Sequence, residues 1–320
     1  MALIFGGRSG EHEISVRSAH SVRQALDPAK YTVLDYFISK DGKWEKPICP
    51  EPGRNPEIDV AFPVLHGTFG EDGTVQGLLE LAEIPYVGAG VLASAVSMDK
   101  AITKRLCQAA GLPVVPYLVL TRGHFDPASL ELPFDFPVFV KPANLGSSVG
   151  ITKVKSRAEL APALTTASRY DRKILVERGV DGREFECAVL GGADPRASVP
   201  CEILPSQEFY TYEDKYLLDK ARIELPANLN RAQTSEMQVL ALAAFKAVDC
   251  EAMARVDFLM DRSTGQFFVN EINTIPGFTS ISMYPKMWEY SGVPYPQLLD
   301  TLIGFALERA AERRQLQYTR

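Results

Sequence analysis

Two carboxylates and an amide in the C-terminal part of the chain have a spacing that suits metal binding. The segment ARVDFLMDRSTGQFFVNEIN places Asp257 before a turn, and Glu271 and Asn273 after it. We expect the two halves to form paired strands, whose side chains alternate between two faces. Arg255 then shares a face with Asp257, and Glu271 shares one with Asn273. If the hairpin pairs symmetrically, residue 257 lies opposite residue 269, and residue 255 lies opposite residue 271.

These oxygen atoms are ligands for a hard divalent cation. Same-face neighbours on a strand lie roughly 6.6 Å apart, twice the rise of ~3.3 Å per residue. At that spacing the three side chains can share Mg²⁺, which completes its coordination with water and phosphate oxygens. The two strands contain no His or Cys, which argues against zinc. The alternative is a solvated polar face, but the acids in VNEIN would repel each other unless neutralised.

A second group is typical of phosphate binding. In FPVFVKPANLGSSVGITKV, Lys141 ends a short apolar strand and is followed by a loop of Gly and Ser. Glycines let backbone N–H groups approach an oxyanion, and Ser147 and Ser148 add hydroxyl donors. A Walker A loop has the opposite order, with the lysine after the glycines and a helix next. Because ITKV resembles a strand, we expect a hairpin flap over a polyphosphate. The alternative is a Gly/Ser turn beside an ordinary surface lysine.

Three further polar residues stand at the ends of predicted elements. Glu11 and His66 follow strands on glycine-containing loops, and ligands bind beyond the carboxyl ends of parallel strands. Lys100 lies in the first turn of a helix in SMDKAITKRLCQAAG, which places Ile102 and Leu106 on one apolar face. A cation there opposes the helix dipole, which suggests a nearby anion. Each of the three could instead be an ordinary loop or solvated residue.

The elements that must position these residues alternate between strands and helices. Strands in ALIF, YTVLDYFI and DVAFPVLHG are combined with a helix over about 15–26 and with helical TVQGLLELAEI. This alternation predicts a parallel sheet. Farther along, SRAELAPALTTAS is helical, KILVE is a strand that ends on Glu177, RGVDG is a hinge, and REFECAVLGG is a strand that contains Glu184. We therefore predict an α/β fold with α+β character in the C-terminal part.

Length and composition narrow the class of protein. A chain of 320 residues exceeds the size at which one core usually stops growing, so two or three domains are expected. The net charge of −6 gives no basis for non-specific nucleic-acid binding. The five cysteines form no C-x-x-C pair, so neither a zinc site nor a disulfide framework is indicated. Neither a signal peptide nor a membrane-spanning apolar run is evident, so we expect a cytosolic protein.

The segment from Pro205 to Pro226 differs from the rest of the chain. It is rich in Tyr and charged residues and fits neither the helical nor the strand period well. A loop of this length in a compact protein is usually functional, and it is often a lid. We expect it to be mobile without ligands and to close when ligands bind.

Taken together, these motifs resemble the D-alanine–D-alanine ligase family, whose members have the ATP-grasp fold. The resemblance is carried, in order, by GGRSGEHEIS, LHGTFGEDGTVQG, SMDK, VKPANLGSSVG, ARVDF and NEINTIPGFTSISMYP. It covers nearly the whole chain. It implies an N-terminal α/β substrate domain over 1–96, a central subdomain with the flap over 97–178, and a C-terminal subdomain with the metal site and lid over 179–320.

The resemblance also implies roles for individual residues. Those expected at ATP are Lys100, Lys141, Ser147, Ser148, Glu177, Arg178, Val180, Glu184 and Lys215. Those expected at the two amino acids are Glu11, which accepts the first ammonium group, and His66, Arg255, Gly277, Ser282 and Met283. The expected catalytic groups are Glu11, Ser147, Tyr216, Arg255, Gly277 and Ser282. Two Mg²⁺ or Mn²⁺ ions are expected on Asp257, Glu271 and Asn273.

The implied reaction is the ATP-dependent joining of two D-alanine molecules through an acyl phosphate, for peptidoglycan precursor synthesis. The sequence DKY, with Lys215 and Tyr216, is the type expected when the acceptor is an amine. A ligase that makes D-Ala–D-lactate or D-Ala–D-Ser stays an alternative, as does an ATP-binding regulator without catalysis. The resemblance further implies a homodimer, and we expect neither a nucleic-acid nor a membrane partner.

Overall fold

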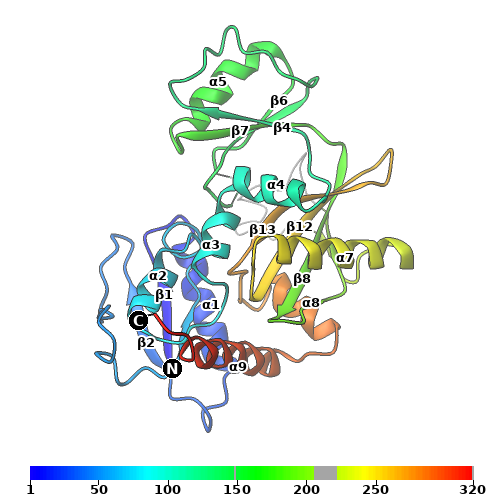
Figure 1. Ribbon diagram of the computed structural model, residues 1–320. Helices are drawn as coiled ribbons and strands as arrows, with labels where there is room; N and C mark the ends of the chain where they lie inside the picture. Colours follow the sequence, from blue (N-terminus) through cyan, green and yellow to red (C-terminus); the bar gives the residue numbers. More distant parts are fainter. Residues whose placement is uncertain (148, 205–221, 319–320) are drawn as a thin grey trace.

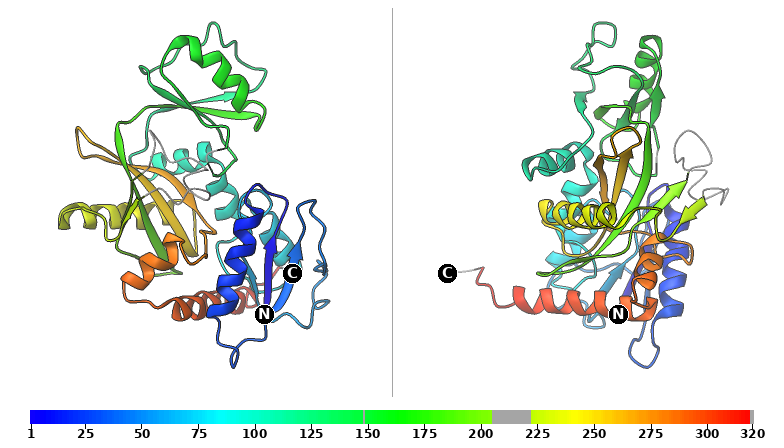
Figure 2. Two further views of the ribbon diagram at one scale, coloured as in Figure 1. Left: turned by 180° about the vertical axis from the view of Figure 1, so that it is seen from behind. Right: turned by 90° about the vertical axis from the view of Figure 1, so that its right-hand side faces the viewer.

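The computed structural model describes residues 1–147, 149–204 and 222–318. These residues form three β-sheets with helices packed against them (Figure 1). The sheet that carries α5 stands apart from the other two, as the additional views also show (Figure 2). Within the predicted lid, residues 205–221 lie outside the described residues.

The N-terminal sheet is parallel, as the sequence predicted. Its order is β2-β1-β3, and its strands are β1 (Ala2–Gly6), β2 (Leu34–Ile38) and β3 (Ala61–Pro63). The helices of this region are α1 (His12–Ala25), α2 (Thr74–Leu81) and α3 (Val91–Met98). Ser15 of α1 donates to the carbonyl oxygen of Val64 at 2.7 Å and accepts from the Gly6 N–H at 2.8 Å. The start of α1 is therefore held at the carboxyl ends of β1 and β3, where Glu11 and His66 lie.

The central sheet is antiparallel and contains the predicted flap. Its order is β4-β7-β5-β6, and its strands are β4 (Tyr117–Thr121), β5 (Val138–Pro142), β6 (Thr152–Val154) and β7 (Lys173–Arg178). Val138 of β5 lies opposite Val154 of β6, so the Gly/Ser segment connects the two strands of a hairpin as predicted. Helix α5 (Arg157–Ala167) packs on β5 and β6.

Helix α4 (Lys100–Ala109) lies between this sheet and the C-terminal one. The apolar face predicted from Ile102 and Leu106 is only partly buried. The buried face carries Lys104 and Cys107 instead. The physical reason is that the buried face meets Glu177, a charged group at the end of β7, rather than a purely apolar surface.

The C-terminal sheet is antiparallel and confirms the α+β character of this part. Its order is β11-β10-β8-β12-β13, and β9 pairs with β8. The strands are β8 (Gly182–Gly191), β9 (Arg196–Ala197), β10 (Cys201–Leu204), β11 (Arg222–Glu224), β12 (Ala252–Asp261) and β13 (Phe267–Asn273). The helices are α7 (Arg231–Ala247), α8 (Met283–Tyr290) and α9 (Tyr295–Arg313).

The register of the β12–β13 hairpin differs from the symmetric one. Asp257 lies opposite Glu271, and Arg255 lies opposite Asn273, whereas the expected partners were residues 269 and 271. The pairing shifts between Asp257 and Phe258 because β13 holds an additional residue at this point, which is a β-bulge. The bulge brings the two carboxylates directly across from each other.

A shared core fixes the N-terminal sheet against the C-terminal one. Phe62 of β3 packs edge-on against Phe278, with ring centroids 5.7 Å apart. Arg309 of α9 donates to the carbonyl oxygens of Tyr86 and Gly88 at 2.7 Å each. Residues from both ends of the sequence therefore reach one site on a common scaffold.

Candidate active site

Two adjoining cavities lie where the three sheets meet. The first, of about 320 Å³, is lined by β5–β8, β12 and β13. The second, of about 900 Å³, lies among α1, the loop after β3, β13 and the start of α8. Lys100, Ser147, Glu186 and Glu271 line both, so these side chains mark the junction.

The described residues with predicted roles divide between the two cavities. The first is lined by Lys100, Lys141, Ser147, Glu177, Arg178, Val180, Glu184, Asp257 and Glu271. The second is lined by Glu11, His66, Lys100, Ser147, Arg255, Glu271, Asn273, Gly277, Ser282 and Met283. Ser148, Lys215 and Tyr216 lie outside the described residues.

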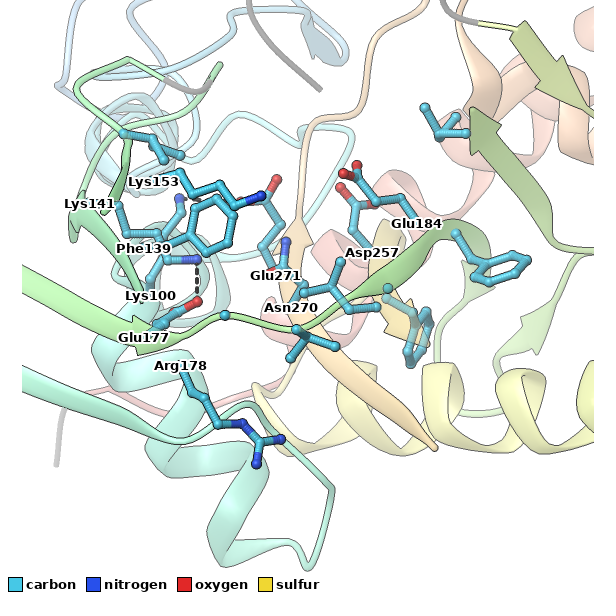
Figure 3. Close-up of a pocket in the computed structure, with 18 of the residues that line it drawn as sticks. Lys100, Phe139, Lys141, Lys153, Glu177, Arg178, Glu184, Asp257, Asn270 and Glu271 are labelled. Carbon is cyan, nitrogen blue, oxygen red and sulfur yellow. Dashed lines mark ion pairs between the residues drawn. The ribbon is translucent and has the colours of Figure 1, made fainter. Parts of the chain in front are cut away.

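A buried carboxylate holds two lysines at one wall of the first cavity. Glu177 is 3% exposed, and one of its oxygens lies 2.7 Å from Lys141 Nζ (Figure 3). Its other oxygen lies 3.1 Å from Lys104 Nζ. Burial by itself raises the pKa of Glu177, but the two ammonium groups outweigh it and lower the pKa. Arg178 also lines the cavity, although its guanidinium group points away from Lys141 and Glu177 (Figure 3).

The predicted anion beside Lys100 is present. Lys100 Nζ donates to the Leu145 carbonyl oxygen at 2.8 Å and lies 3.3 Å from Glu271 Oε2. Asp99 caps α4 by accepting from the N–H groups of Ala101 and Ile102, which offsets the unfavourable cation in the first turn. Lys100 therefore links the flap loop, through Leu145, to the acidic strand β13.

A row of three carboxylates crosses the C-terminal sheet. Glu186 of β8 and Glu271 of β13 lie opposite Asp257 of β12, one on each side. Arg255 donates two hydrogen bonds of 2.7 Å to Asp257, and its Nε lies 3.3 Å from Glu186. Burial raises the pKa of Asp257 to about 7, against the opposing effect of Arg255, and the charges of Glu186 and Glu271 add to the increase.

The residues at this row fit a divalent cation by their chemistry. Asn273 Oδ1 is buried and has no hydrogen-bond partner among the described residues, so an acceptor oxygen is left over beside Glu271 and Asp257. A buried polar atom of this kind indicates an ion or water that completes its contacts. Within residues 1–147, 149–204 and 222–318, no three His, Cys, Asp or Glu side chains converge as a metal site by themselves. The described side chains therefore offer a partial ligand set, which suits Mg²⁺ because it keeps water and phosphate ligands.

Glu11 and His66 face the second cavity from adjacent loops. Ser147 donates a short hydrogen bond to Glu11 Oε1, and its φ of 52° is uncommon for a residue other than glycine. His66 Nδ1 lies 3.1 Å from the Ile275 carbonyl oxygen and 3.7 Å from Glu71 Oε1. Burial lowers the pKa of His66, but the carboxylate of Glu71 more than reverses this, and the pKa is raised.

The far wall of the second cavity is the start of α8. Ser282 precedes the helix, and its Oγ accepts from the Thr279 N–H at 3.0 Å. A Cβ at Gly277 would lie 2.6 Å from this Oγ, so any larger residue there would force Ser282 to shift. The Gly277 backbone can thus approach a ligand closely, and the N–H groups in the first turn of α8, which have no acceptor within the helix, favour a carboxylate.

Four charged residues at or directly behind the site were not predicted from the sequence. They are Glu71, Lys104, Lys153 and Glu186. Lys104 lies one helical turn after Lys100, and Glu186 lies on the same face of β8 as Glu184, so helical and strand periodicity could have indicated both. Lys153, from β6 of the flap, points toward Glu271 in Figure 3. Glu71 follows Gly70, but no spacing pairs it with His66.

A β-hairpin flap, paired lysines and a facing acidic hairpin define a protein of the ATP-grasp class. Family models described as D-ala D-ala ligase N-terminus and D-ala D-ala ligase C-terminus match residues 1–52 and 45–89, and residues 106–304. The chain therefore belongs to the D-alanine–D-alanine ligase family.

Individual relatives are similar to this chain over nearly its whole length. A D-alanine–D-alanine ligase of Solibacter usitatus is 61% identical, with 100% of this chain and 98% of the relative covered. The solved D-alanine–D-alanine ligase of Coxiella burnetii is 39% identical, with a TM-score of 0.87 and coverage of 98% and 95%. The VanG D-Ala:D-Ser ligase of Enterococcus faecalis is 35% identical, with a TM-score of 0.86 and coverage of 95% and 98%. None of the helices within the described ranges is long and apolar enough to cross a membrane.

Proposed function

We propose that this protein joins two D-alanine molecules to D-alanyl-D-alanine, with conversion of ATP to ADP and phosphate. The observation that carries the proposal is the junction of the two cavities. Lys100 and Ser147 stand between a cavity with lysines and carboxylates and a cavity with Glu11 and the start of α8. A phosphoryl donor and an amino-acid carboxylate can meet at this junction.

In the first half of the proposed reaction, the carboxylate of the first D-alanine attacks the γ-phosphorus of ATP. ADP leaves, and the product is an acyl phosphate with a good leaving group. Phosphoryl transfer depends mainly on positioning and charge neutralisation. We assign Lys100 and Lys141 to the phosphates and Glu11 to the ammonium group of the first D-alanine. Ser147 holds Glu11, which ties the flap to the amino-acid site.

In the second half, the free amine of the second D-alanine attacks the acyl carbonyl carbon. The amine loses a proton, and phosphate leaves with the electron pair of the broken C–O bond. We assign Arg255 and the Gly277 N–H to the tetrahedral oxyanion, where each pre-placed donor contributes on the order of 3–4 kcal/mol. The start of α8 at Ser282 and Met283 then holds the carboxylate of the second D-alanine.

We further propose that Asp257, Glu271 and Asn273 hold two Mg²⁺ ions. A bound Mg²⁺ would supply positive charge against the phosphate charge that develops in the reaction. Asn273 Oδ1, which is buried and has no hydrogen-bond partner among the described residues, supports this assignment. Measuring ADP affinity with and without Mg²⁺ in wild type and in Asn273→Leu tests it, because only the wild type should gain affinity from the metal.

The ligase activity is tested by release of phosphate with ATP and D-alanine, compared with L-alanine. Wild type should release phosphate only with D-alanine, and mass spectrometry should detect D-alanyl-D-alanine. Absence of D-alanine-dependent phosphate release would leave a nucleotide-binding regulator as the better proposal.

The alternative is a ligase whose second substrate is not D-alanine, because the VanG D-Ala:D-Ser ligase has a similar fold. Assays with D-alanine plus either D-serine or D-lactate separate the three products by mass. We expect the D-Ala–D-Ala product to dominate in each mixture.

We also propose the division into domains at 96/97 and 178/179, a homodimer and a cytoplasmic location. The resemblance of the motifs to the family supports the first two proposals. The need for ATP and free D-alanine supports the third. Light scattering during size-exclusion chromatography tests the homodimer directly.

A further inference from the structure

Lys104 is a buried lysine that the proposed reaction leaves without a role. Its side chain is 1% exposed, and it lines neither cavity. Its Nζ lies 3.1 Å from Glu177 Oε1 and 5.7 Å from the centroid of the Tyr117 ring. The contact with Glu177 is an ion pair whose angles are not those of a hydrogen bond. Nζ has no hydrogen-bond partner among the described residues. A buried ammonium group with so few partners is costly and needs a reason.

The reason lies in the order of charges behind the first cavity. Lys104, Glu177 and Lys141 form a line of positive, negative and positive groups, in which each lysine meets a different oxygen of Glu177. Lys141 lines the cavity, whereas Lys104 lies behind Glu177 on α4. The three groups together carry one surplus positive charge, and Lys141 is the member that can offer it to a ligand.

We propose that Lys104 is a positioning residue for nucleotide binding: it neutralises Glu177 from behind and so releases Lys141 for the phosphates of the nucleotide. The inference rests on the proposed function, since it assigns the first cavity to ATP. Without Lys104, Glu177 would have Lys141 as its one cationic partner among the described residues. Turning Lys141 toward a phosphate would then leave a buried carboxylate unpaired, and removing one partner of a buried pair is strongly unfavourable.

The test compares Lys104→Met, which keeps the length of the side chain, with Lys104→Arg, which keeps the charge. Isothermal titration with Mg²⁺ and ADP measures nucleotide affinity without any need for ligase activity. Lys104→Met should weaken ADP binding about 10- to 100-fold, as expected for loss of one charge-assisted hydrogen bond from Lys141. Lys104→Arg should bind within about threefold of wild type. The KM for D-alanine should change much less than the KM for ATP.

Lys173→Met is the matched control. Lys173 also pairs with a carboxylate beside α4, that of Asp99, but it has no contact with Glu177. This variant loses an ion pair beside the same helix, although a less buried one than that of Lys104, and should keep the ADP affinity of wild type. Equal losses of ADP affinity in Lys173→Met and Lys104→Met would show a general effect on α4 and overturn the proposal.

A double-mutant cycle shows whether Lys104 acts through Glu177. In a Glu177→Gln background, Lys104→Met should change ADP affinity by less than about threefold, because no carboxylate is left to compensate. The double variant removes both charges behind the cavity and leaves only Lys141, which lines the cavity, so it carries the test even if Lys104→Met alone does not fold. The proposal would be overturned if Lys104→Met reduced ADP affinity as much in the Glu177→Gln background as in wild type. It would also be overturned if Lys104→Met alone bound ADP with wild-type affinity. Failure of wild type to release phosphate with D-alanine would instead refute the ligase function and leave the ADP measurements unaffected.

Discussion

Replacing Asp257 with asparagine should change how the stability of the metal-free protein depends on pH. The side chain is 14% exposed and lies between Glu186 and Glu271 on neighbouring strands. Burial raises its pKa to about 7, although Arg255 opposes the increase. The folded protein therefore retains a proton at pH values where the unfolded chain has already released it. A raised acid pKa makes the wild type less stable as pH rises from about 4 through about 7.

The size of the effect follows from the two pKa values. The interval between the ordinary value of 3.8 and about 7, at 1.36 kcal/mol per pH unit, corresponds to about 4 kcal/mol in total. About 2.5 kcal/mol of this falls between pH 5 and pH 8. Asparagine has nearly the shape of a protonated aspartic acid and does not titrate. Any hydrogen bond that the substitution weakens therefore changes the stability of the variant by the same amount at every pH.

Urea unfolding at pH 5, 6, 7 and 8 in the presence of EDTA provides the measurement. The free energy of unfolding of Asp257→Asn, relative to wild type, should increase by about 2.5 kcal/mol from pH 5 to pH 8. Asp261→Asn is the control on the same strand. The hydroxyl and N–H of Ser263 lower the pKa of Asp261, so this carboxyl stays ionised throughout the range. Parallel curves for wild type and Asp257→Asn would refute the reasoning, because Asp257 would then be ionised at every pH tested.

Three further predictions concern the proposed ligase site. Glu271→Gln should abolish ligation, because a proposed ligand of Mg²⁺ is lost. The metal-free variant should be as stable as wild type or slightly more stable, because an acidic neighbour of Asp257 is removed. Turnover retained at saturating Mg²⁺ would contradict a metal role for Glu271. Glu11→Gln should raise the KM for D-alanine about 10- to 100-fold and leave ADP affinity near that of wild type, since a charge-assisted hydrogen bond contributes about 1.5–3 kcal/mol. The reverse pattern would place Glu11 at the nucleotide. Gly277→Ala should lower both kcat and Tm, because the new Cβ would lie 2.6 Å from Ser282 Oγ. Adding Ser282→Ala should restore Tm, and failure to do so would place the crowding elsewhere.

The parts of the fold that follow local patterns were predictable from the sequence. The N-terminal sheet is parallel because strands and helices alternate there. The flap is a hairpin because two β-rich runs enclose a Gly/Ser turn, and the pairing of Val138 with Val154 agrees with this. In both cases the periodicity and turn residues within each segment identify the element, although in the parallel sheet Ala2 pairs with the distant residues Leu34 and Ala61.

The parts that depend on distant or irregular contacts were not predictable in the same way. The expected register of β12 and β13 was wrong by one residue near the turn, where Phe258 rather than Asp257 lies opposite Val269. A β-bulge shifts the other half of the hairpin by one more residue, and no periodicity shows where a bulge falls. The buried face of α4 was missed because its partner, Glu177, lies 73 residues after Lys104 in the chain. Hydrophobic periodicity assumes an apolar core, and Lys104 is buried against a charge instead.

The charges of the two cavities alternate in sign, and this arrangement explains how so many ionised side chains can be buried at one site. Lys104 and Lys141 neutralise Glu177, Lys100 lies beside Glu271, and Arg255 lies between Glu186 and Asp257. Breaking the pairs of Glu177, which are almost fully buried, is costly unless a new partner replaces the old one. A phosphate group is such a replacement partner for Lys141 and Lys100, and a divalent cation is one for Asp257 and Glu271. Ligand binding at this site is therefore an exchange of ion-pair partners. Lys104 and Glu186 have no assigned contact with a ligand, but each still pairs with a side chain whose other partner turns to the ligand. We therefore expect both residues to affect ligand affinity.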